Sequence, residues 1–218
     1  MISLQFEQQE GAGLKILCLG AHCDDIEIGC GGTLLKMIEA GKVAQIKWIV
    51  FASNEERKKE AIASAEAFLI NVSNKEITVL NYRDAFLNFS ALAIKEFYEL
   101  IKKTFDPDLI FTHYRNDRHQ DHRLISDLTW NTFRSHLILE YEIPKYDGDL
   151  GIPNSFFHLT EAIAKRKVNI MLEKFQSQKN KHWFDQETFL SLMRIRGMEA
   201  ACLTKYAEAF HMRKVVFL

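Results

Sequence analysis

The sequence predicts an α/β fold with a mostly parallel, doubly wound sheet. Short apolar runs rich in Ile, Leu and Val recur along the chain, and segments with helical spacing separate them. Strands that alternate with helices in this way form a parallel sheet joined by crossover helices. At 218 residues, the chain has the length of one such domain with a sizeable core.

Four strands are expected in the core, at residues 14–21, 45–53, 75–82 and 106–113. Helices are expected directly after the first strand and at residues 54–70 and 91–104. The helix at 54–70 opens on a charged turn and then carries apolar side chains at helical spacing, namely Ile62, Ala65, Phe68 and Leu69. Together these elements predict a Rossmann-like core over about residues 13–140.

The rest of the chain, about residues 141–218, is expected to be a helical C-terminal extension of the same domain. Two of the three prolines fall within residues 142–154, which predicts an irregular loop. Helical spacing follows near residues 160–178 and 186–208, and residues 213–218 are expected to form a last strand. No internal repeat is visible, so we expect one domain over residues 1–218.

Composition excludes several classes of partner. Twenty-eight basic residues balance twenty-nine acidic ones, so no overall field favours nucleic acid or an anionic membrane. The N-terminus has no basic region followed by an apolar run, and no window reaches the roughly 18 apolar residues of a membrane span. The four cysteines follow no C-x-x-C pattern, which indicates free thiols. We therefore expect a cytoplasmic protein that acts on a small molecule, and homo-oligomer formation is left open.

Two clusters of metal-binding side chains follow predicted strands. The first is His22-Cys23-Asp24-Asp25, after the strand at 14–21, and the second is HYRNDRHQDHR, residues 113–123, after the strand at 106–113. Either cluster alone is ordinarily a cap or a surface feature. In an open parallel sheet, however, the carboxyl ends of neighbouring strands share one edge, where ligands bind. Two histidines and a carboxylate from these clusters would leave one metal position open, as in catalytic zinc sites.

The residues GCGGT, 29–33, follow the first cluster. They lack both the G-x-G-x-x-G spacing and the Gly-Lys-Ser/Thr ending of nucleotide-binding loops. A nucleotide loop is therefore not expected. We expect these glycines to let the backbone pass close to the metal site and to start the helix.

The two clusters together resemble the LmbE-like or PIG-L-type zinc-dependent N-deacetylases. The family's first motif, A-H-P-D-D-E-x-x-G-x-G-G-T, has its counterpart in AHCDDIEIGCGGT, and its second motif, H-x-D-H, in HQDH. Arg57 and Glu60 at the start of the second helix and YAEAF near the C-terminus also look like the family. The resemblance therefore covers most of the chain.

The resemblance implies a role for each motif residue. His22, Asp25 and His122 would hold one Zn²⁺ per chain, although other divalent metals are left open. Asp24 would be the general base. His119 would be the acid and oxyanion stabiliser, with Asp121 as its orienting partner, because a hydrogen-bonded carboxylate favours the protonated imidazole. Zinc lowers the pKa of its bound water toward about 7, so a carboxylate beside it can accept the proton.

Two positions depart from the family's first motif. Cys23 stands where the family has Pro, and Ile26 stands where it has Glu, with Glu27 one place later. The missing Glu bears on how the metal ligands are oriented. Cys23 is expected to be structural, because its neighbour His22 would compete for the same approach to the metal.

Residues at or beyond the predicted strand ends could contact a substrate. Arg57, Asp84, Arg115 and Asp117 are expected to bind sugar hydroxyls, and the alternative for each is an ordinary surface salt bridge. Lys145 and Tyr146 are expected substrate contacts in the loop at 142–154, which is long enough to form a wall of the substrate site, and the alternative is a plain connection.

The resemblance implies a zinc-dependent hydrolase that removes an N-acyl group, most simply acetyl, from an amino sugar, a nucleotide sugar or a sugar conjugate such as an N-acetylglucosamine derivative. One alternative is a zinc amidase acting on another sugar-linked amide, such as a thiol-sugar conjugate, because the pocket selects the substrate. Another is a non-catalytic Rossmann-like module that binds a sugar or nucleotide. Such a module would need neither the adjacent aspartates nor HQDH.

Overall fold

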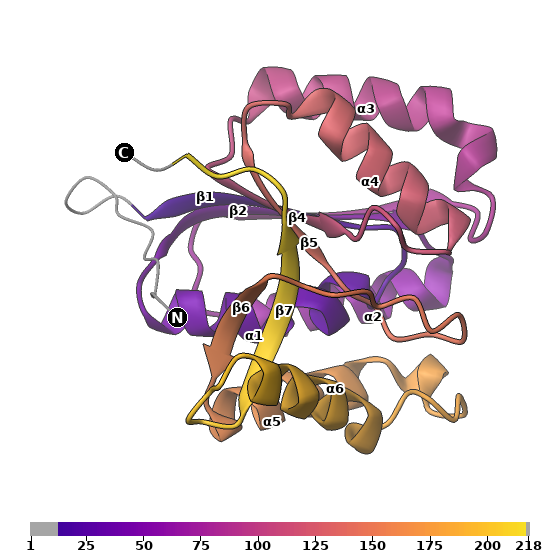
Figure 1. Cartoon of the computed structure of the whole chain (residues 1–218). Coiled ribbons are helices and arrows are strands. Elements are labelled where there is room, and N and C mark those ends of the chain that lie inside the picture. Colours follow the sequence, from indigo (N-terminus) through magenta and orange to yellow (C-terminus); the bar gives the residue numbers. More distant parts are fainter. Residues whose placement is uncertain (1–12, 217–218) are drawn as a thin grey trace.

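The computed structural model describes residues 13–216, which form one seven-stranded sheet with helices on both faces (Figure 1). The strands are β1 Leu14–Gly20, β2 Val43–Ala52, β3 Lys75–Tyr82, β4 Leu109–His113, β5 Leu137–Tyr141, β6 Ser155–Leu159 and β7 Tyr206–Met212. The helices are α1 Asp25–Glu39, α2 Glu55–Phe68, α3 Ala91–Thr104, α4 Gln120–Thr132, α5 Glu161–Lys174 and α6 Gln186–Glu199. Short 3₁₀ turns lie at Leu87–Ser90 and Gln176–Gln178.

The sheet has the order β3-β2-β1-β4-β5-β7-β6. The first five of these strands are parallel, whereas β7 runs antiparallel to both β5 and β6. From β1 the chain moves to β2 and β3 on one side, and it then returns to β4 and β5 on the other. A crevice opens outside the carboxyl ends of β1 and β4, where this direction reverses. The mostly parallel, doubly wound fold predicted from the sequence is confirmed.

Each face of the sheet is covered by its own helices. In Figure 1, α3 and α4 lie above the sheet, whereas α1, α2, α5 and α6 lie below it. Phe51 of β2 stacks on Tyr98 of α3 on the upper side, with ring centroids 5.5 Å apart. On the lower side, Trp48 of the same strand contacts Phe68 of α2. The alternating residues of β2 thus enter two separate apolar cores.

The glycines of α1 have a different role from the one expected. Gly29 and Gly31 lie inside the helix, not at the metal site, and a Cβ atom on Gly29 would come within 2.2 Å of the Tyr141 ring. A Cβ on Gly31 would come within 2.7 Å of Phe68. They are needed because α1 packs closely against β5 and α2. The expectation that they bring the backbone past the metal was wrong.

The C-terminal part differs most from the expected elements. Helix α6 ends at Glu199, and β7 begins at Tyr206, inside the segment near 186–208 where the sequence predicted a helix. Ala201 and Lys205 have positive φ angles of 50° and 74°, so the helix cannot continue through them. Residues 213–216 are not a strand, and the last two residues of that expected strand lie outside the described part. Helix α4 and the strands β5 and β6 were not expected.

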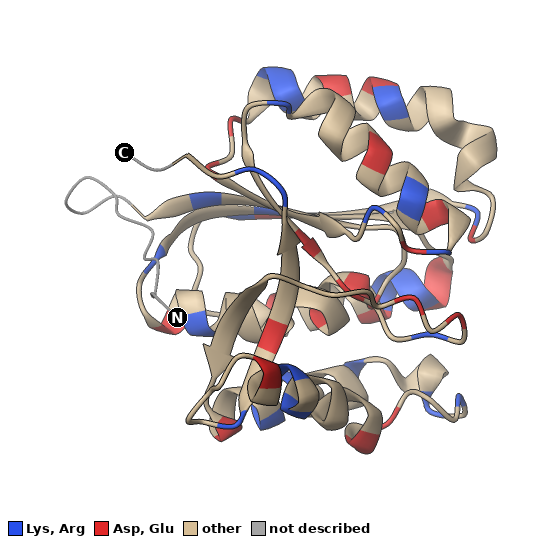
Figure 2. Ribbon diagram, viewed as in Figure 1, with Lys and Arg blue, Asp and Glu red and all other residues tan. Residues whose placement is uncertain are grey.

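Charged residues of both signs are interspersed along α3 and α4 (Figure 2). These two helices therefore present no stripe of one charge to solvent, in keeping with the net charge of −1. Within residues 13–216, no helix has both the length and the apolar character needed to cross a membrane.

Candidate active site

Three side chains predicted to bind metal converge at the crevice between β1 and β4. His22 follows β1, Asp25 is the first residue of α1, and His122 lies in the first turn of α4. His22 Nδ1 is 3.1 Å from His122 Nε2 and 3.4 Å from Asp25 Oδ2. His122 Nε2 is 3.6 Å from Asp25 Oδ1. The topology thus brings together residues that are about 100 positions apart in sequence.

The spacing and protonation of these side chains fit a divalent metal. A tetrahedral zinc ion about 2.0–2.1 Å from each ligand would place the ligand atoms roughly 3.3 Å apart. His122 Nδ1 donates to Asp117 Oδ2 at 2.9 Å, so its Nε2 presents a lone pair. His22 Nε2 faces Asp84 and Asp121, which turns its Nδ1 toward His122 Nε2. In the metal-free protein a proton on His22 Nδ1 bridges this 3.1 Å contact, and a divalent metal would take the place of that proton.

The charge on Asp25 also suits a metal ligand. Burial acts to raise its pKa, but His122, His113 and His22 outweigh burial and hold the pKa well below its ordinary value. Burial lowers the pKa of His22, whereas the carboxylates of Asp25, Asp121 and Asp84 raise it well above the ordinary value overall. The site therefore holds an ionised carboxylate within a dense ring of imidazoles.

His122 is supported by Asp117, which the sequence placed in the second cluster and led us to expect as a substrate contact. Lys145 Nζ donates to Asp117 Oδ2 at 2.7 Å and also lies 2.8 Å from Asp149 Oδ1. A histidine ligand whose second nitrogen bonds to a carboxylate keeps the tautomer that metal binding requires. The position of Asp117, five residues before His122, was a signal in the sequence. Lys145 lines the cleft as expected, but its partners are these two carboxylates.

His113, at the end of β4, belongs to the same cluster. Its ring is fully buried and stacks on His122, with centroids 4.0 Å apart. Its Nε2 accepts from the Ala21 amide at 2.9 Å and lies 3.2 Å from Asp25 Oδ2. His113, Asp25 and His122 lie close enough together to form an alternative group of potential metal ligands, but the bond from the Ala21 amide occupies the lone pair of His113 Nε2. The sequence included it in the second cluster without giving it a role.

Asp24 faces the cleft from the start of α1. It occupies the N-cap position, but its side chain makes no capping hydrogen bond. Its Oδ1 instead lies 3.2 Å from Nη2 of Arg57, whose Nε is 3.7 Å from Glu60. The half-buried guanidinium directs the Asp24 carboxylate, and its buried Nε has no hydrogen-bond partner among the described residues. Arg57 thus contacts Asp24 directly, and its Nε–H remains available as a hydrogen-bond donor.

The expected pairing of Asp121 with His119 is not formed. Asp121 Oδ2 lies 3.3 Å from His22 Nε2, and its Oδ1 accepts from the Leu87 amide. His119 caps α4, and its Nδ1 accepts from the backbone amide of Asp121. Burial and the neighbouring His122 and His22 lower the pKa of His119. Asp121 therefore orients His22, and the charges of Asp121 and Asp25, which act to raise the pKa of His119, are outweighed by burial and the two imidazoles.

The cleft above these residues has a volume of about 530 Å³. Arg57, Asp84 and Lys145 line it as expected, but Arg115 does not. The Arg115 guanidinium lies over the Trp130 ring at 4.9 Å, with Nε 4.0 Å from Glu140, so the structure does not bring it together with the other expected substrate contacts. The sequence missed lining residues from the C-terminal part, namely Gln178, Lys181 and Trp183. Nothing local marks these three as part of a site.

Cys23 lines the same cleft, but its thiol is poorly suited to bind a metal. Its thiol donates to the Ala52 carbonyl at 3.5 Å, and burial raises its pKa to about 12. A protonated thiol is a poor ligand and a poor nucleophile.

The neighbouring Glu27 is fully buried, and burial raises its pKa to about 8.

The chain is similar in sequence and in fold to known proteins. The chain is 28% identical to a protein of Escherichia coli named uncharacterized deacetylase YaiS, over 59% of this chain and 74% of that protein. Among solved structures, N,N'-diacetylchitobiose deacetylase from Pyrococcus horikoshii matches with a TM-score of 0.70 and 22% identity, covering 91% of this chain and 83% of that one.

The 4-carboxy-2-hydroxymuconate hydratase GalB from Pseudomonas putida also matches, with a TM-score of 0.70 and 15% identity over 94% of this chain and 99% of that one. At such identities the two solved structures support the fold alone. The family model described as PIG-L, GlcNAc-PI de-N-acetylase, matches residues 17–133 and includes both sequence motifs. Because this match spans more than half of the chain, the protein belongs to the PIG-L family.

Proposed function

We propose that this protein is a zinc-dependent N-deacetylase that removes an acetyl group from an amino sugar or a sugar conjugate. As a member of a deacetylase family it is a hydrolase, and a neighbour in fold acts on diacetylchitobiose. The observation that carries the proposal is the convergence of His22, Asp25 and His122, with Asp24 beside them at the base of the cleft. A sugar or nucleotide module without chemistry would not need this group.

His22, Asp25 and His122 would hold the metal. Zinc bound there supplies Lewis-acid polarisation of a carbonyl and a water of lowered pKa. Asp24 then accepts the proton of the attacking water, since its carboxylate faces the cleft and Arg57 directs it. The same carboxylate returns the proton to the departing amine.

His119 would steady the oxyanion as a neutral donor. Its Nδ1 accepts a backbone hydrogen bond, so the ring proton is on Nε2. A neutral N–H donor stabilises the negative charge that develops on the carbonyl oxygen during attack. This role agrees with the lowered pKa of His119, and it replaces the protonated acid that the sequence led us to expect.

The lining of the cleft supports a hydroxylated substrate. Arg57, Asp84 and Lys145 provide donors and acceptors, and Trp183 provides an aromatic face against which a sugar ring can pack. A thiol-sugar conjugate would fit the same description. Location in the cytoplasm and formation of a homo-oligomer stay predictions from the sequence.

The test is release of acetate from a panel of N-acetyl sugars, free, nucleotide-linked and thiol-linked, together with the zinc content of protein purified without chelator. We expect about one zinc per chain, loss of acetate release on chelation and its return on addition of zinc. Direct detection of acetate separates deacetylation from a hydratase reaction of the GalB type. Protein with one zinc per chain that releases acetate from no member of the panel would contradict the proposal.

A further inference from the structure

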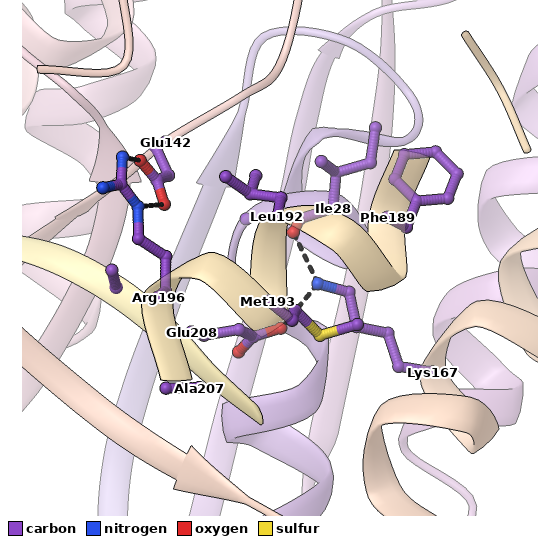
Figure 3. Close-up of a pocket in the computed structure, with 11 residues that line it drawn as sticks. Ile28, Glu142, Lys167, Phe189, Leu192, Met193, Arg196, Ala207 and Glu208 are labelled. Carbon is purple, nitrogen blue, oxygen red and sulfur yellow. Dashed lines mark hydrogen bonds and ion pairs between the residues drawn. The ribbon is translucent and has the colours of Figure 1, made fainter. Parts of the chain in front are cut away.

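Two buried ion pairs line one small cavity next to α1 (Figure 3). Lys167 of α5 pairs with Glu208 of β7, with Nζ and Oε1 2.6 Å apart. Arg196 of α6 pairs with Glu142 through two contacts of 2.8 and 2.6 Å. All four side chains are buried, and all four residues lie outside the segment that the family model matches.

Only the first pair is bonded to the backbone of α1. Glu208 accepts the amide of Gly32 at 2.8 Å and that of Thr33 at 2.6 Å. Lys167 donates to the carbonyl of Ile28 at 2.6 Å, the contact drawn in Figure 3. In a regular α-helix the amide of residue 32 donates to the carbonyl of residue 28. Glu208 and Lys167 therefore bind the amide of Gly32 and the carbonyl of Ile28, the two groups that pair with each other in a regular helix.

Gly32 makes room for this contact. A Cβ atom at position 32 would lie 2.6 Å from Leu159 Cδ1 and 3.0 Å from Glu208 Oε1. Any side chain there would displace the carboxylate or the leucine. Glycine weakens a helix interior, so its presence here is explained by the carboxylate it admits.

A buried ion pair is a poor source of stability, because desolvation of two charges offsets their attraction. Geometry is the better explanation for this one. The first turn of α1 directs its carboxylates to the site: Asp24 makes no capping bond, and Asp25 faces the histidines. The Ile28 amide donates to the Asp24 carbonyl at 3.0 Å, so Lys167 is two hydrogen bonds away from Asp24.

We propose that Lys167 and Glu208 are positioning residues for the metal centre. By holding Ile28, Gly32 and Thr33 they fix the first two turns of α1, and through these turns the directions of Asp24 and Asp25. The inference rests on the proposed metal site.

The test compares two double variants. Lys167→Met/Glu208→Met removes the pair that is bonded to α1, and removal of both charges avoids leaving one buried and unpaired. Arg196→Met/Glu142→Met removes the neighbouring pair, which makes no hydrogen bond to α1 among the described residues. The readouts are the visible spectrum of the Co²⁺-loaded protein, the affinity for Zn²⁺ in competition with a chelating dye, and kcat and KM with added metal.

For Lys167→Met/Glu208→Met we expect a changed Co²⁺ spectrum, roughly tenfold weaker Zn²⁺ binding, and a fall in kcat with little change in KM. The control should keep the wild-type spectrum and bind Zn²⁺ within about twofold of wild type. Equal behaviour of the two double variants, whether both unchanged or both weakened, would overturn the inference.

If Lys167→Met/Glu208→Met shows no folded circular dichroism spectrum, Glu208→Gln takes its place. The amide keeps the shape but loses one of the two acceptors, so Zn²⁺ binding should weaken by about threefold. Unchanged Zn²⁺ affinity in that variant would overturn the inference as well. Wild-type protein that takes up no Co²⁺ would instead overturn the proposed function, and the inference with it.

Discussion

The segment from β1 to α4 and the segment after it contribute different kinds of side chain to the cleft. Every imidazole and carboxylate of the metal cluster comes from the first segment, namely His22, Asp25, Asp84, His113, Asp117, His119, Asp121 and His122. The second segment contributes Lys145 to the support of Asp117, and Gln178, Lys181 and Trp183 to the wall. Reactive groups and their surroundings are thus separated along the chain, although they meet in space.

This difference shows which residues of the site can be found from short sequence motifs and which cannot. Except for Asp84, which follows β3, the reactive groups lie at or after the ends of β1 and β4, two strand ends that the topology forces together, so short motifs are enough to find them. The supporting groups come from loops and helices whose positions depend on the whole fold. Substitutions in the two segments should therefore differ in size and in kind.

The largest effects are expected at the adjacent aspartates of the first segment. Asp24→Asn removes the proposed base and should lower kcat by about 10² to 10⁴-fold while zinc stays bound. Asp25→Asn should weaken zinc binding itself, and activity should partly return with excess zinc. Zinc content and kcat, with and without added zinc, check both variants. If the two lose metal equally, the division of roles between them is wrong.

A smaller effect is expected at Asp117, which orients a ligand without joining the proposed set. Asp117→Asn should weaken zinc binding by about 10- to 100-fold, because His122 then loses the carboxylate that fixes its tautomer. Competition with a chelating dye measures this affinity. Zinc affinity equal to that of wild type would place His122 outside the metal centre.

Lys145 offers a test of the second segment alone. Lys145→Met should weaken zinc binding by several-fold, since Asp117 keeps its bond to His122 but loses the ammonium. Arg115→Met is the matched control. It removes another cation, which follows β4 as Asp117 does. The Arg115 side chain, however, lies over the Trp130 ring and outside the cleft. An equal loss in both variants would indicate a general effect of charge.

The smallest expected effect concerns acid stability of the metal-free protein. Burial acts to raise the pKa of Asp117, but His122, His113 and Lys145 outweigh it and hold the pKa well below the ordinary value. Its contribution to stability is therefore complete above about pH 5 and is lost as the pH falls through the ordinary pKa of about 4 toward the lower folded value. Asp117→Asn should lower the free energy of unfolding by roughly 1–3 kcal/mol at neutral pH.

Urea titrations at pH 7 and below pH 3 measure this difference between wild type and Asp117→Asn. The gap should shrink toward low pH, because the Asp117 carboxyl of unfolded wild-type protein then binds a proton that the folded protein does not yet bind. A gap that stays constant across that range would show that the charge of Asp117 contributes nothing to stability.

The fold could be predicted well in its first part. The apolar strands and the helix expected at 91–104 are present, the latter as α3 with those bounds. Helix α4 was missed because its N-cap and first turn hold His119, Asp121 and His122, which lie at the site and leave little helical pattern. Strand β7 was missed because its neighbours β5 and β6 pair with it from distant parts of the chain.

The site could be predicted in its residues but less well in its contacts. Asp121 lies beside His119 in sequence, yet it contacts His22 from the end of another strand. The direction of a carboxylate at a helix start depends on such tertiary neighbours, and no spacing reveals them. Lys167 and Glu208 are 41 residues apart, and neither stands in a metal-ligand pattern.

The bond between Lys145 and Asp117 has a consequence for redesign of this enzyme. Residues 142–154 are a natural place to exchange sequence with a relative in order to change the substrate, because this stretch has no helix or strand of its own. A graft that omits a cation at position 145 would also leave Asp117 short of a partner and loosen His122. Selectivity and metal retention would then change together, so libraries of this loop should keep Lys145 constant.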